Sequence, residues 1–237
     1  NKPERMNAYD AEMARELIDA VKGASGSGVI VLTGSGKAFC AGGYLANLSD
    51  PDPEALRSMF YGSLEVYESL RQSPRPVIAA VNGAAAGGGN ELVVACDIAI
   101  ASEDARFAIT EVRMGITPAP ILPEVISAIG VRQARRYTLT AETFDAHEAK
   151  HIGLIHEICP VGGLDAAAEP IIDAILRSAP KAVSDTKKII NEIADKTLDD
   201  ELADRLATIS AGGRDKPEGI EGFSAFLEKR SPNWYKS

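Results

Sequence analysis

Residues 77–101 read VIAAVNGAAAGGGNELVVACDIAIA. Two short apolar runs, at residues 77–81 and 97–101, flank a glycine-rich turn and a short helical stretch at residues 91–95. Short apolar runs are typical of strands covered on both faces, and strands that alternate with helices join through right-handed crossovers into a parallel sheet. The stretch therefore predicts an α/β fold whose site lies in the loops at the carboxyl ends of the strands.

The same alternation extends on both sides of this stretch. Before it, the pattern predicts a helix at residues 7–21, a break at 23–28, a strand at 29–33 that runs into GSGKAFCAGG, and a helix at 54–70. From about Ile121 onward the pattern becomes helical, with helices expected at residues 166–178, 182–194, 199–209 and 218–230. The terminal segment has Phe223, Phe226 and Leu227 on one face, a stripe that often packs on a neighbour.

Composition limits the class of protein. The chain has 237 residues, 45% of them hydrophobic and 25% charged, which is enough for one domain or a domain with an appendage. No apolar run approaches the roughly 20 residues that cross a bilayer, and the start, NKPERMNAYD, lacks the apolar centre of a signal peptide. Three widely spaced cysteines, Cys40, Cys96 and Cys159, disfavour a disulfide framework, so we expect a cytoplasmic protein.

Charge and glycine spacing indicate the kind of ligand. Lysine and arginine number 25 against 34 acidic residues, and a net charge of -9 opposes non-specific attraction to nucleic acid. The GSGKA segment lacks the spacing of a phosphate-binding P-loop, because Val31 and Ala38 stand where that motif needs glycine and Ser or Thr. A small-molecule partner is therefore expected, and neither nucleic acid nor a membrane.

Two glycine-rich loops each follow a predicted strand. If adjacent strands bring the loops together, one N–H from Gly42 or Gly43 and one from Gly87 or Gly88 could hold an oxygen that becomes anionic. The second loop also opens a helix, whose first turn favours negative charge. The alternative is that these glycines only permit tight turns and close packing, and the spacing alone leaves both interpretations open.

Two glutamates follow these elements. Glu91 lies one helical turn beyond Gly88, and Glu111 follows the apolar run at residues 107–109. Two carboxylates in one site do not both ionise easily, so such a pair can hold water and move a proton. The alternative makes Glu91 a helix-dipole residue and Glu111 a surface charge.

Residues 147–156, HEAKHIGLIH, contain the H-E-x-x-H pattern of zinc hydrolases. A simpler interpretation is a short structural helix in which Asp145 is the N-cap, Glu148 reaches back in a capping box, and Gly153 ends the helix. His156 falls one residue too early for the extended zinc motif. We therefore expect no metal here.

Several stretches together resemble the crotonase, or enoyl-CoA hydratase/isomerase, family. They are TGSGKAFCAGGYL, AAVNGAAAGGGNELVVACDIAIAS, ARFAITEVRMGITPA, RRYTLTAETFDAHEAKHIGLIHEI and EGFSAFLEKR. The resemblance covers nearly the whole chain and implies an α/β crotonase-type spiral of βαβ units with a C-terminal helical trimerisation region. It implies a core at residues 1–175, apparently without the family's first strand, and an oligomerisation region at residues 176–237.

The resemblance also assigns roles to the candidate residues. It implies an oxyanion hole from the N–H groups of Gly43 and Gly88, with Glu91 activating a water and Glu111 donating a proton to the α-carbon. The expected reaction is syn addition of water to a 2-enoyl-CoA thioester. No separate cofactor is expected, since coenzyme A is part of the substrate.

Binding of coenzyme A is the second implication. The matching positions are Arg5 near the phosphates, Ala41 near the adenine, and Phe226 and Lys229 on a terminal helix supplied by a neighbouring subunit. The resemblance therefore implies a homo-oligomer, either a trimer or a dimer of trimers. Arg5 and Lys229 could instead be surface charges, and the other positions packing residues.

Two positions depart from the family pattern. Tyr44 stands where the family usually has aspartate, and TPAPILPEV replaces a glycine-rich run, with Ala119 at the position whose N–H helps to hold the water. The proline-alanine variant resembles the methylglutaconyl-CoA hydratase branch, which suggests fatty acid or branched-chain catabolism. An isomerase, a CoA-ester hydrolase and a non-catalytic member of the family remain alternatives, and the acyl chain stays open.

Overall fold

The structure is a computed structural model that describes residues 1–26, 28–44 and 52–235. Its core repeats a strand–strand–helix unit three times along the chain. In each unit the first strand joins one sheet, the second strand joins another, and a helix leads back to the next unit. The units are β1, β2 and α2, then β3, β4 and α3, then β5, β6 and α4.

The first sheet has the order β1-β3-β5-β8, and its pairs are all parallel. Its strands are β1 (Ile30–Thr33), β3 (Val77–Val81), β5 (Ile98–Ser102) and β8 (Glu157–Cys159). Both faces of β3 are covered: Val77 and Ala79 belong to the main core, whereas Ile78 packs with Ile100 and Ala168 of α6 (Leu164–Leu176) on the other side. The predicted strands covered on both faces are therefore confirmed for β3 and β5, whereas β1, at the edge of the sheet, alternates between half-buried and exposed residues.

The second sheet has the order β2-β4-β6-β7, with an antiparallel pair only between β6 and β7. Its strands are β2 (Ala38–Cys40), β4 (Ala84–Ala86), β6 (Arg106–Ala108) and β7 (Phe144–Asp145). The sequence did not predict this second sheet, because strands of two or three residues are too short to show a periodic pattern. The strands β2 and β4 lie within glycine-rich segments that the sequence pattern predicted to be loops.

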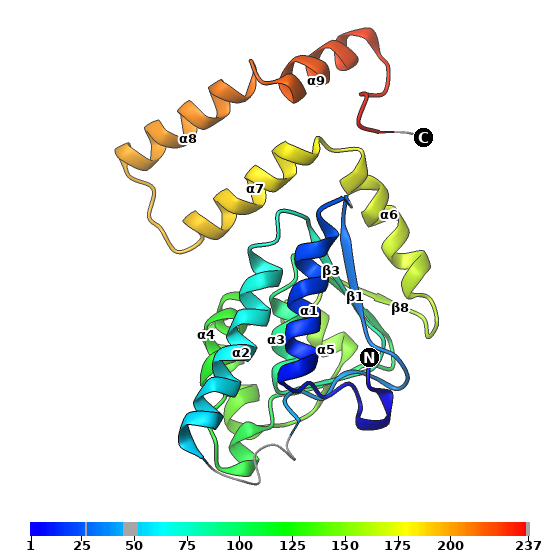
Figure 1. The fold of residues 1–237 in the computed structure, drawn as a ribbon, viewed down its shortest axis with the longest axis vertical. Coiled ribbons are helices and arrows are strands. Elements are labelled where there is room, and N and C mark those ends of the chain that lie inside the picture. Colours follow the sequence, from blue (N-terminus) through cyan, green and yellow to red (C-terminus); the bar gives the residue numbers. More distant parts are fainter. Residues whose placement is uncertain (27, 45–51, 236–237) are drawn as a thin grey trace.

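The helices follow the predicted order, with ends that differ by a few residues. They are α1 (Ala11–Gly23), α2 (Pro53–Arg71), α3 (Gly88–Val94), α4 (Leu122–Thr140), α5 (Ala146–His151) and α6 to α9 of the C-terminal half. Asp10 caps α1 by accepting a hydrogen bond from the N–H of Met13 at 3.0 Å. Helices α1 and α2 lie side by side (Figure 1). In the break predicted at residues 23–28, residue 27 lies outside the described part, as does residue 45 of the first family-like stretch.

The last three helices form a layer of their own at one end of the molecule (Figure 1). They are α7 (Pro180–Ile193), α8 (Asp200–Gly213) and α9 (Pro217–Glu228). Lys187 anchors α7 to the core, because its buried ammonium group donates to Leu70 O at 2.9 Å and to Asp97 Oδ2 at 2.7 Å. The boundary expected between residues 175 and 176 falls at the end of α6, and an oligomerisation role for the part beyond it stays a prediction.

The HEAKH segment forms the short helix α5. Asp145 Oδ1 accepts from the N–H of Glu148 at 2.9 Å, and the hydrogen bonds Gly153 N to Lys150 O and Leu154 N to Ala149 O end the helix around a glycine with φ of 88°. The predicted N-cap and glycine stop are confirmed. The second half of the capping box was wrong, because the Glu148 carboxylate accepts a hydrogen bond from Tyr137 at 2.5 Å instead.

Two findings concern membrane-spanning helices and the cysteines. No helix among the described residues is both long and apolar enough to span a bilayer. Cys40, Cys96 and Cys159 are buried free thiols, which agrees with the expectation of no disulfide framework.

Candidate active site

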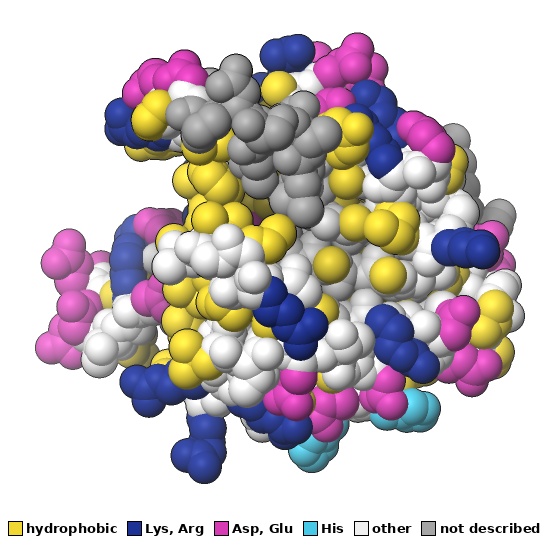
Figure 2. Space-filling view, turned by 90° about the horizontal axis from the view of Figure 1, so that it is seen from below, with side chains coloured by type: hydrophobic (Ala, Val, Ile, Leu, Met, Phe, Trp, Pro, Cys, Tyr) yellow, Lys and Arg dark blue, Asp and Glu magenta, His cyan; other side chains and the backbone are white. Residues whose placement is uncertain are grey.

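A cavity of about 680 Å³ opens between the first two helices and the two glycine-rich turns. Helices α1 and α2 supply apolar walls, whereas Gly42, Gly43, Gly87 and Gly88 form the wall opposite. Figure 2 shows hydrophobic side chains gathered along a hollow on one face of the molecule. Of the residues expected at the reacting centre, Gly43, Gly88, Glu91 and Glu111 all line this cavity.

The first turn is held from behind by Tyr9. The N–H of Tyr9 donates to Gly42 O at 2.9 Å, and the N–H of Tyr44 donates to Tyr9 O at 2.9 Å. Peptide groups alternate in direction along an extended chain, so the N–H of Gly43 points away from Tyr9. It donates no hydrogen bond to another described residue and is available to a ligand.

The second turn lies directly against the first. A Cβ built on Gly42, whose φ is 86°, would lie 2.8 Å from Ala86 O and 3.1 Å from the nitrogen of Gly88. Only glycine tolerates both this backbone conformation and this close approach. The two turns thus place two unpaired amide donors, those of Gly43 and Gly88, on one cavity wall, as an oxyanion hole requires.

Glu91 projects from the first turn of α3 and is 1% exposed. Burial raises the pKa of its carboxyl to about 8, and the negative charges of Glu124 and Glu111 act in the same direction. Its neighbour Asn90 fixes the helix by donating to Ala85 O at 3.1 Å and to Ala108 O at 2.7 Å, which ties α3 to two strands of the second sheet. Glu91 is therefore a buried carboxyl on a fixed support.

Glu111 begins a short 3-10 helix, Glu111–Met114, directly after the second sheet. A Cβ on Gly87 would lie 2.7 Å from Glu111 Oε1, so this carboxylate lies against the second glycine turn. Burial raises the pKa of Glu111, while backbone N–H groups of its own turn oppose the rise. The Oε2 atoms of Glu91 and Glu111 are buried and have no hydrogen-bond partner among the described residues, so both can receive a ligand or water.

Two tyrosines at this site were not predicted from the sequence. Tyr9 and Tyr67 lie 58 positions apart, and their hydroxyl groups are hydrogen-bonded to each other. A Cβ on Gly88 would lie 2.5 Å from the hydroxyl of Tyr9 and 2.9 Å from that of Tyr67, so the pair covers the second turn. Tyr67 fits the helical periodicity of α2 like any core residue, so no local signal in the sequence marks it.

Ala119 was expected to hold a water, and the structure does not bring it to the cavity wall. It begins the 3-10 helix Ala119–Ile121 and is exposed. The neighbouring prolines, Pro118 and Pro120, line the cavity in its place. A role for the N–H of Ala119 in holding water stays a prediction.

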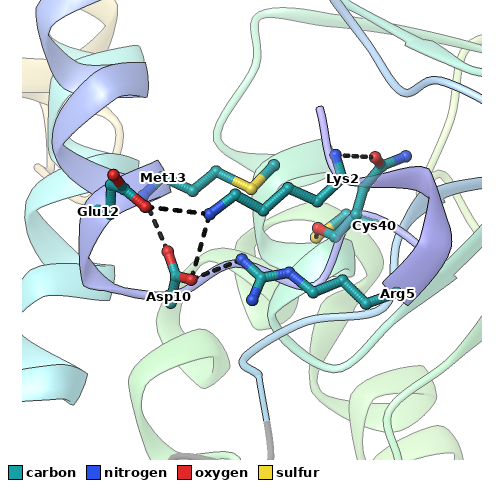
Figure 3. Close-up of polar contacts among 7 residues, drawn as sticks. Lys2, Arg5, Asp10, Glu12, Met13 and Cys40 are labelled. Carbon is teal, nitrogen blue, oxygen red and sulfur yellow. Dashed lines mark hydrogen bonds and ion pairs between the residues drawn. The ribbon is translucent and has the colours of Figure 1, made fainter.

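The expected coenzyme A residues divide into two groups. Ala41 lines the cavity, and its N–H donates to Met6 O at 3.0 Å. Arg5 pairs with Asp10 at 2.6 Å (Figure 3). Its guanidinium also stacks 4.3 Å above the ring of Tyr44. Arg5 is therefore not a free cation, and a phosphate at this place would compete with Asp10.

The departure at Tyr44 has a structural explanation. Its ring provides the cation–π surface for Arg5, and such a contact contributes roughly 0.5–1 kcal/mol at an exposed site. Lys2 joins the same cluster at 3.3 Å from Asp10 and 3.2 Å from Glu12 (Figure 3). The hydrogen bond from Met13, together with these cations, holds the pKa of Asp10 well below its usual range.

Phe226 and Lys229 lie at the end of α9, in the separate helical layer (Figure 1). Phe226 is 79% exposed, and neither residue lines the cavity of its own chain. Their expected role in binding coenzyme A would need a second copy of the chain and stays a prediction. Among the described residues, no group of three His, Cys, Asp or Glu side chains is placed to hold a metal ion.

Comparison with known proteins gives consistent similarities. The family model for enoyl-CoA hydratase/isomerase matches residues 1–237. A short-chain-enoyl-CoA hydratase from Clostridium acetobutylicum is 32% identical over 242 residues, covering 100% of this chain and 92% of the relative.

Solved structures show the same similarity in three dimensions. An enoyl-CoA hydratase from Shewanella pealeana is 37% identical with a TM-score of 0.92, covering 98% of this chain and 89% of that one. AtuE from Pseudomonas aeruginosa is 34% identical with a TM-score of 0.94, covering 100% and 94%. The alternation of two strands and a helix is thus shared with these crotonase-type folds.

Proposed function

Because the chain belongs to the enoyl-CoA hydratase/isomerase family, we propose that it adds water to the double bond of a 2-enoyl-CoA thioester. One observation carries this proposal: the buried Glu91 and the half-buried Glu111 line the same cavity as the amides of Gly43 and Gly88. Two carboxyls and two amide donors are the groups that syn hydration needs.

In the proposed complex, the thioester carbonyl oxygen accepts hydrogen bonds from the N–H groups of Gly43 and Gly88. Addition of hydroxide at the β-carbon moves electrons through the double bond and places negative charge on that oxygen. Fixed amide donors stabilise this enolate more than they stabilise the substrate, and removing one such donor typically lowers kcat by about 10²–10³-fold. The oxyanion hole thereby favours the transition state.

The two carboxyls divide the transfer of a proton. Glu91 takes a proton from the water as its oxygen bonds to the β-carbon, and Glu111 gives a proton to the α-carbon. The product gains one water in total, and exchange of a proton between the two carboxyls and solvent restores the starting state. Both oxygens that lack a partner, Oε2 of Glu91 and Oε2 of Glu111, suit this use.

The pKa shifts of Glu91 and Glu111 support a pair of carboxyls that shares a single proton. Burial raises the pKa of both carboxyls, and the negative charge of Glu111 raises that of Glu91 further. Two such groups in one site hold one proton over a wide pH range, so that one acts as a base and the other as an acid. The pKa of about 8 favours the proton on Glu91 at neutral pH, whereas the proposed reaction needs Glu91 ionised.

We further propose that a second copy of the chain completes the coenzyme A site. Phe223, Phe226 and Leu227 of α9 are 49%, 79% and 76% exposed, which is unusual for large apolar side chains on one helix. Burial of this face between copies would bring Phe226 and Lys229 to a neighbouring cavity. Light scattering coupled to gel filtration tests the assembly, and a monomer at micromolar concentration would contradict it.

Activity is tested by the loss of enoyl-thioester absorbance when crotonyl-CoA or methylglutaconyl-CoA is added. Glu91→Gln and Glu111→Gln should each abolish the loss while the protein stays folded by circular dichroism. Activity that neither change affects would contradict the assigned mechanism. Conversion of a 3-enoyl-CoA without hydration would instead identify an isomerase, and release of free thiol a CoA-ester hydrolase.

A further inference from the structure

Tyr9 connects both glycine turns of the cavity. Its backbone is hydrogen-bonded to the first turn through Gly42 O and the N–H of Tyr44, each at 2.9 Å. Its side chain crosses to the second turn, where its hydroxyl lies 2.5 Å from the position of a Cβ on Gly88. One residue therefore fixes the distance between the two amide donors.

Tyr67 continues this connection toward the carboxyl of Glu91. It projects from α2, is 5% exposed, and its hydroxyl is hydrogen-bonded to that of Tyr9. The same hydroxyl lies over the first turn of α3, 2.9 Å from the position of a Cβ on Gly88, and Glu91 projects from that turn into the same cavity. Tyr67 also lowers the pKa of Glu91 against the effect of burial. The two hydroxyls thus lie between the first glycine turn and the turn that carries the buried carboxyl.

The other groups that face Glu91 are acidic. Glu111 approaches from its 3-10 helix and Glu124 from α4, and both disfavour a negative charge on Glu91. Tyr9 faces Glu91 as well, through the hydroxyl pair. Of the side chains around the Glu91 carboxyl in the described part of the chain, only the Tyr67 hydroxyl favours its ionised form.

Taking the proposed hydratase function as the basis, we propose that Tyr67, held by Tyr9, is the positioning residue that orients the Glu91 carboxylate toward the oxyanion hole. Tyr67 acts through Glu91 and takes no proton from the substrate. A donor at this place stabilises the carboxylate that must accept a proton from water, and it fixes which oxygen faces the cavity. The hydroxyl pair of Tyr9 and Tyr67 accordingly connects the two glycine turns of the proposed oxyanion hole to the proposed base, Glu91.

Substitution Tyr67→Phe removes the donor and keeps the ring. Hydrogen bonds to charged groups are typically strong enough that kcat at pH 7 should fall about 10-fold or more, while KM changes less than about twofold. The acidic limb of the pH profile of kcat/KM should move up by about one unit, because the carboxylate loses its stabilising partner. Tyr9→Phe should lower kcat and move the acidic limb in the same directions, but by less than Tyr67→Phe does.

The chain offers a matched control in Tyr137, a buried tyrosine whose hydroxyl also donates to a glutamate, Glu148, at 2.5 Å. Tyr137→Phe should lower thermal stability and leave the pH profile in place. In the Glu91→Gln background, Tyr67→Phe should have no further effect on kcat. An unchanged pH limb in Tyr67→Phe, or an equal shift in Tyr137→Phe, would overturn the proposal.

A second measurement separates this proposal from the hydratase function itself. Carbon-13 NMR of glutamate-labelled protein follows the titration of the Glu91 carboxyl without substrate, with Glu91→Gln to assign the signal. A higher pKa for Glu91 in Tyr67→Phe supports the positioning role even where the wild type hydrates none of the enoyl-CoA substrates tested. An unchanged titration overturns that role even where the wild type is an active hydratase.

Discussion

Helices α3 and α5 are both short, and each carries a glutamate in its first turn, yet only one of them makes a site. Glu91 of α3 is 1% exposed, whereas the Glu148 side chain of α5 is 33% exposed. Helix α5 has a side-chain N-cap in Asp145, while α3 begins at Gly87 with no side-chain cap. The first turn of α3 has no side-chain cap for its N–H groups and faces a cavity. The first turn of α5 is capped by the side chain of Asp145.

The difference shows that surroundings rather than spacing decide the chemistry of a carboxyl. In α5 the letters HEAKH match a zinc motif, but His147 and His151 are exposed and the glutamate is committed to Tyr137. In α3 no such short metal-binding pattern occurs, but burial raises the pKa of Glu91 to about 8 in a cavity that Glu111 also lines. A group with a shifted pKa in a cavity is the better candidate for catalysis.

The largest effect is expected when the two glutamates, Glu91 of α3 and Glu148 of α5, are each replaced by glutamine. Glu91→Gln should lower kcat by about 10²–10⁴-fold, the range in which a positioned acid or base contributes. Glu148→Gln should leave kcat unchanged, because an amide oxygen can still accept the hydrogen bond from Tyr137. Steady-state kinetics with crotonyl-CoA measures both.

The histidines of α5 give the control for this prediction. His147→Ala and His151→Ala should also leave kcat unchanged, since both side chains point to solvent. A loss of activity in either histidine variant, restored by added zinc, would reverse the comparison and move the site to α5.

The next effect concerns the two glycines that supply amides. Gly88→Ala should lower kcat by about 10²-fold, because its methyl group would lie 2.5 Å from the Tyr9 hydroxyl and displace the hydroxyl pair. Gly43→Ala should change kcat by less than about threefold, because no atom of the described residues beyond its chain neighbours lies within 4 Å of the added carbon. Equal losses in both variants would show that the pair above Gly88 has no special role.

The sequence predicted the fold class and two glutamates that line one cavity, but not the short strands around them. Glu91 and Glu111 stand out because each follows a strand, and a parallel sheet brings such positions together. The strands β4 and β6 were missed, because runs such as Ala84–Ala86 form strands only through pairing with distant segments. Local patterns carry no information on such pairing.

The same limit explains why Tyr67 was missed and why Ala119 does not line the cavity. Tyr67 reaches the site only because α2 packs beside α1, and its partner Tyr9 is 58 positions away. Ala119 was placed at the site by alignment with a glycine-rich run, but the two prolines beside it turn that segment so that they line the cavity. Side-chain direction depends on backbone torsions that the resemblance does not supply.

A third prediction compares the two helices by stability. The raised pKa of Glu91 means that the folded protein binds a proton more tightly than the unfolded chain does, so this group lowers stability as pH rises from about 4.5 to 8. Wild type should lose about 1.4 kcal/mol per pH unit relative to Glu91→Gln, or about 2–3 kcal/mol between pH 6 and pH 8.

Urea unfolding at several pH values measures this difference. Glu91→Gln should therefore be more stable than wild type at pH 8 and similar to it at pH 4.5, although it is inactive. A constant difference between Glu91→Gln and wild type across this range would mean that the pKa of Glu91 is the same in the folded protein as in the unfolded chain.

The smallest effect is expected at the cap that distinguishes α5 from α3. Asp145→Ala removes the acceptor 2.9 Å from the N–H of Glu148, and loss of such a cap typically costs about 1 kcal/mol of the free energy of unfolding. Activity should be unchanged, because α5 lines no part of the cavity. Asp145→Asn should recover most of the lost stability, since the amide oxygen can accept the same hydrogen bond. If Asp145→Ala lowered kcat without lowering stability, α5 would be tied to the reaction after all, and the contrast between a closed helix and an open one would not explain where the chemistry lies.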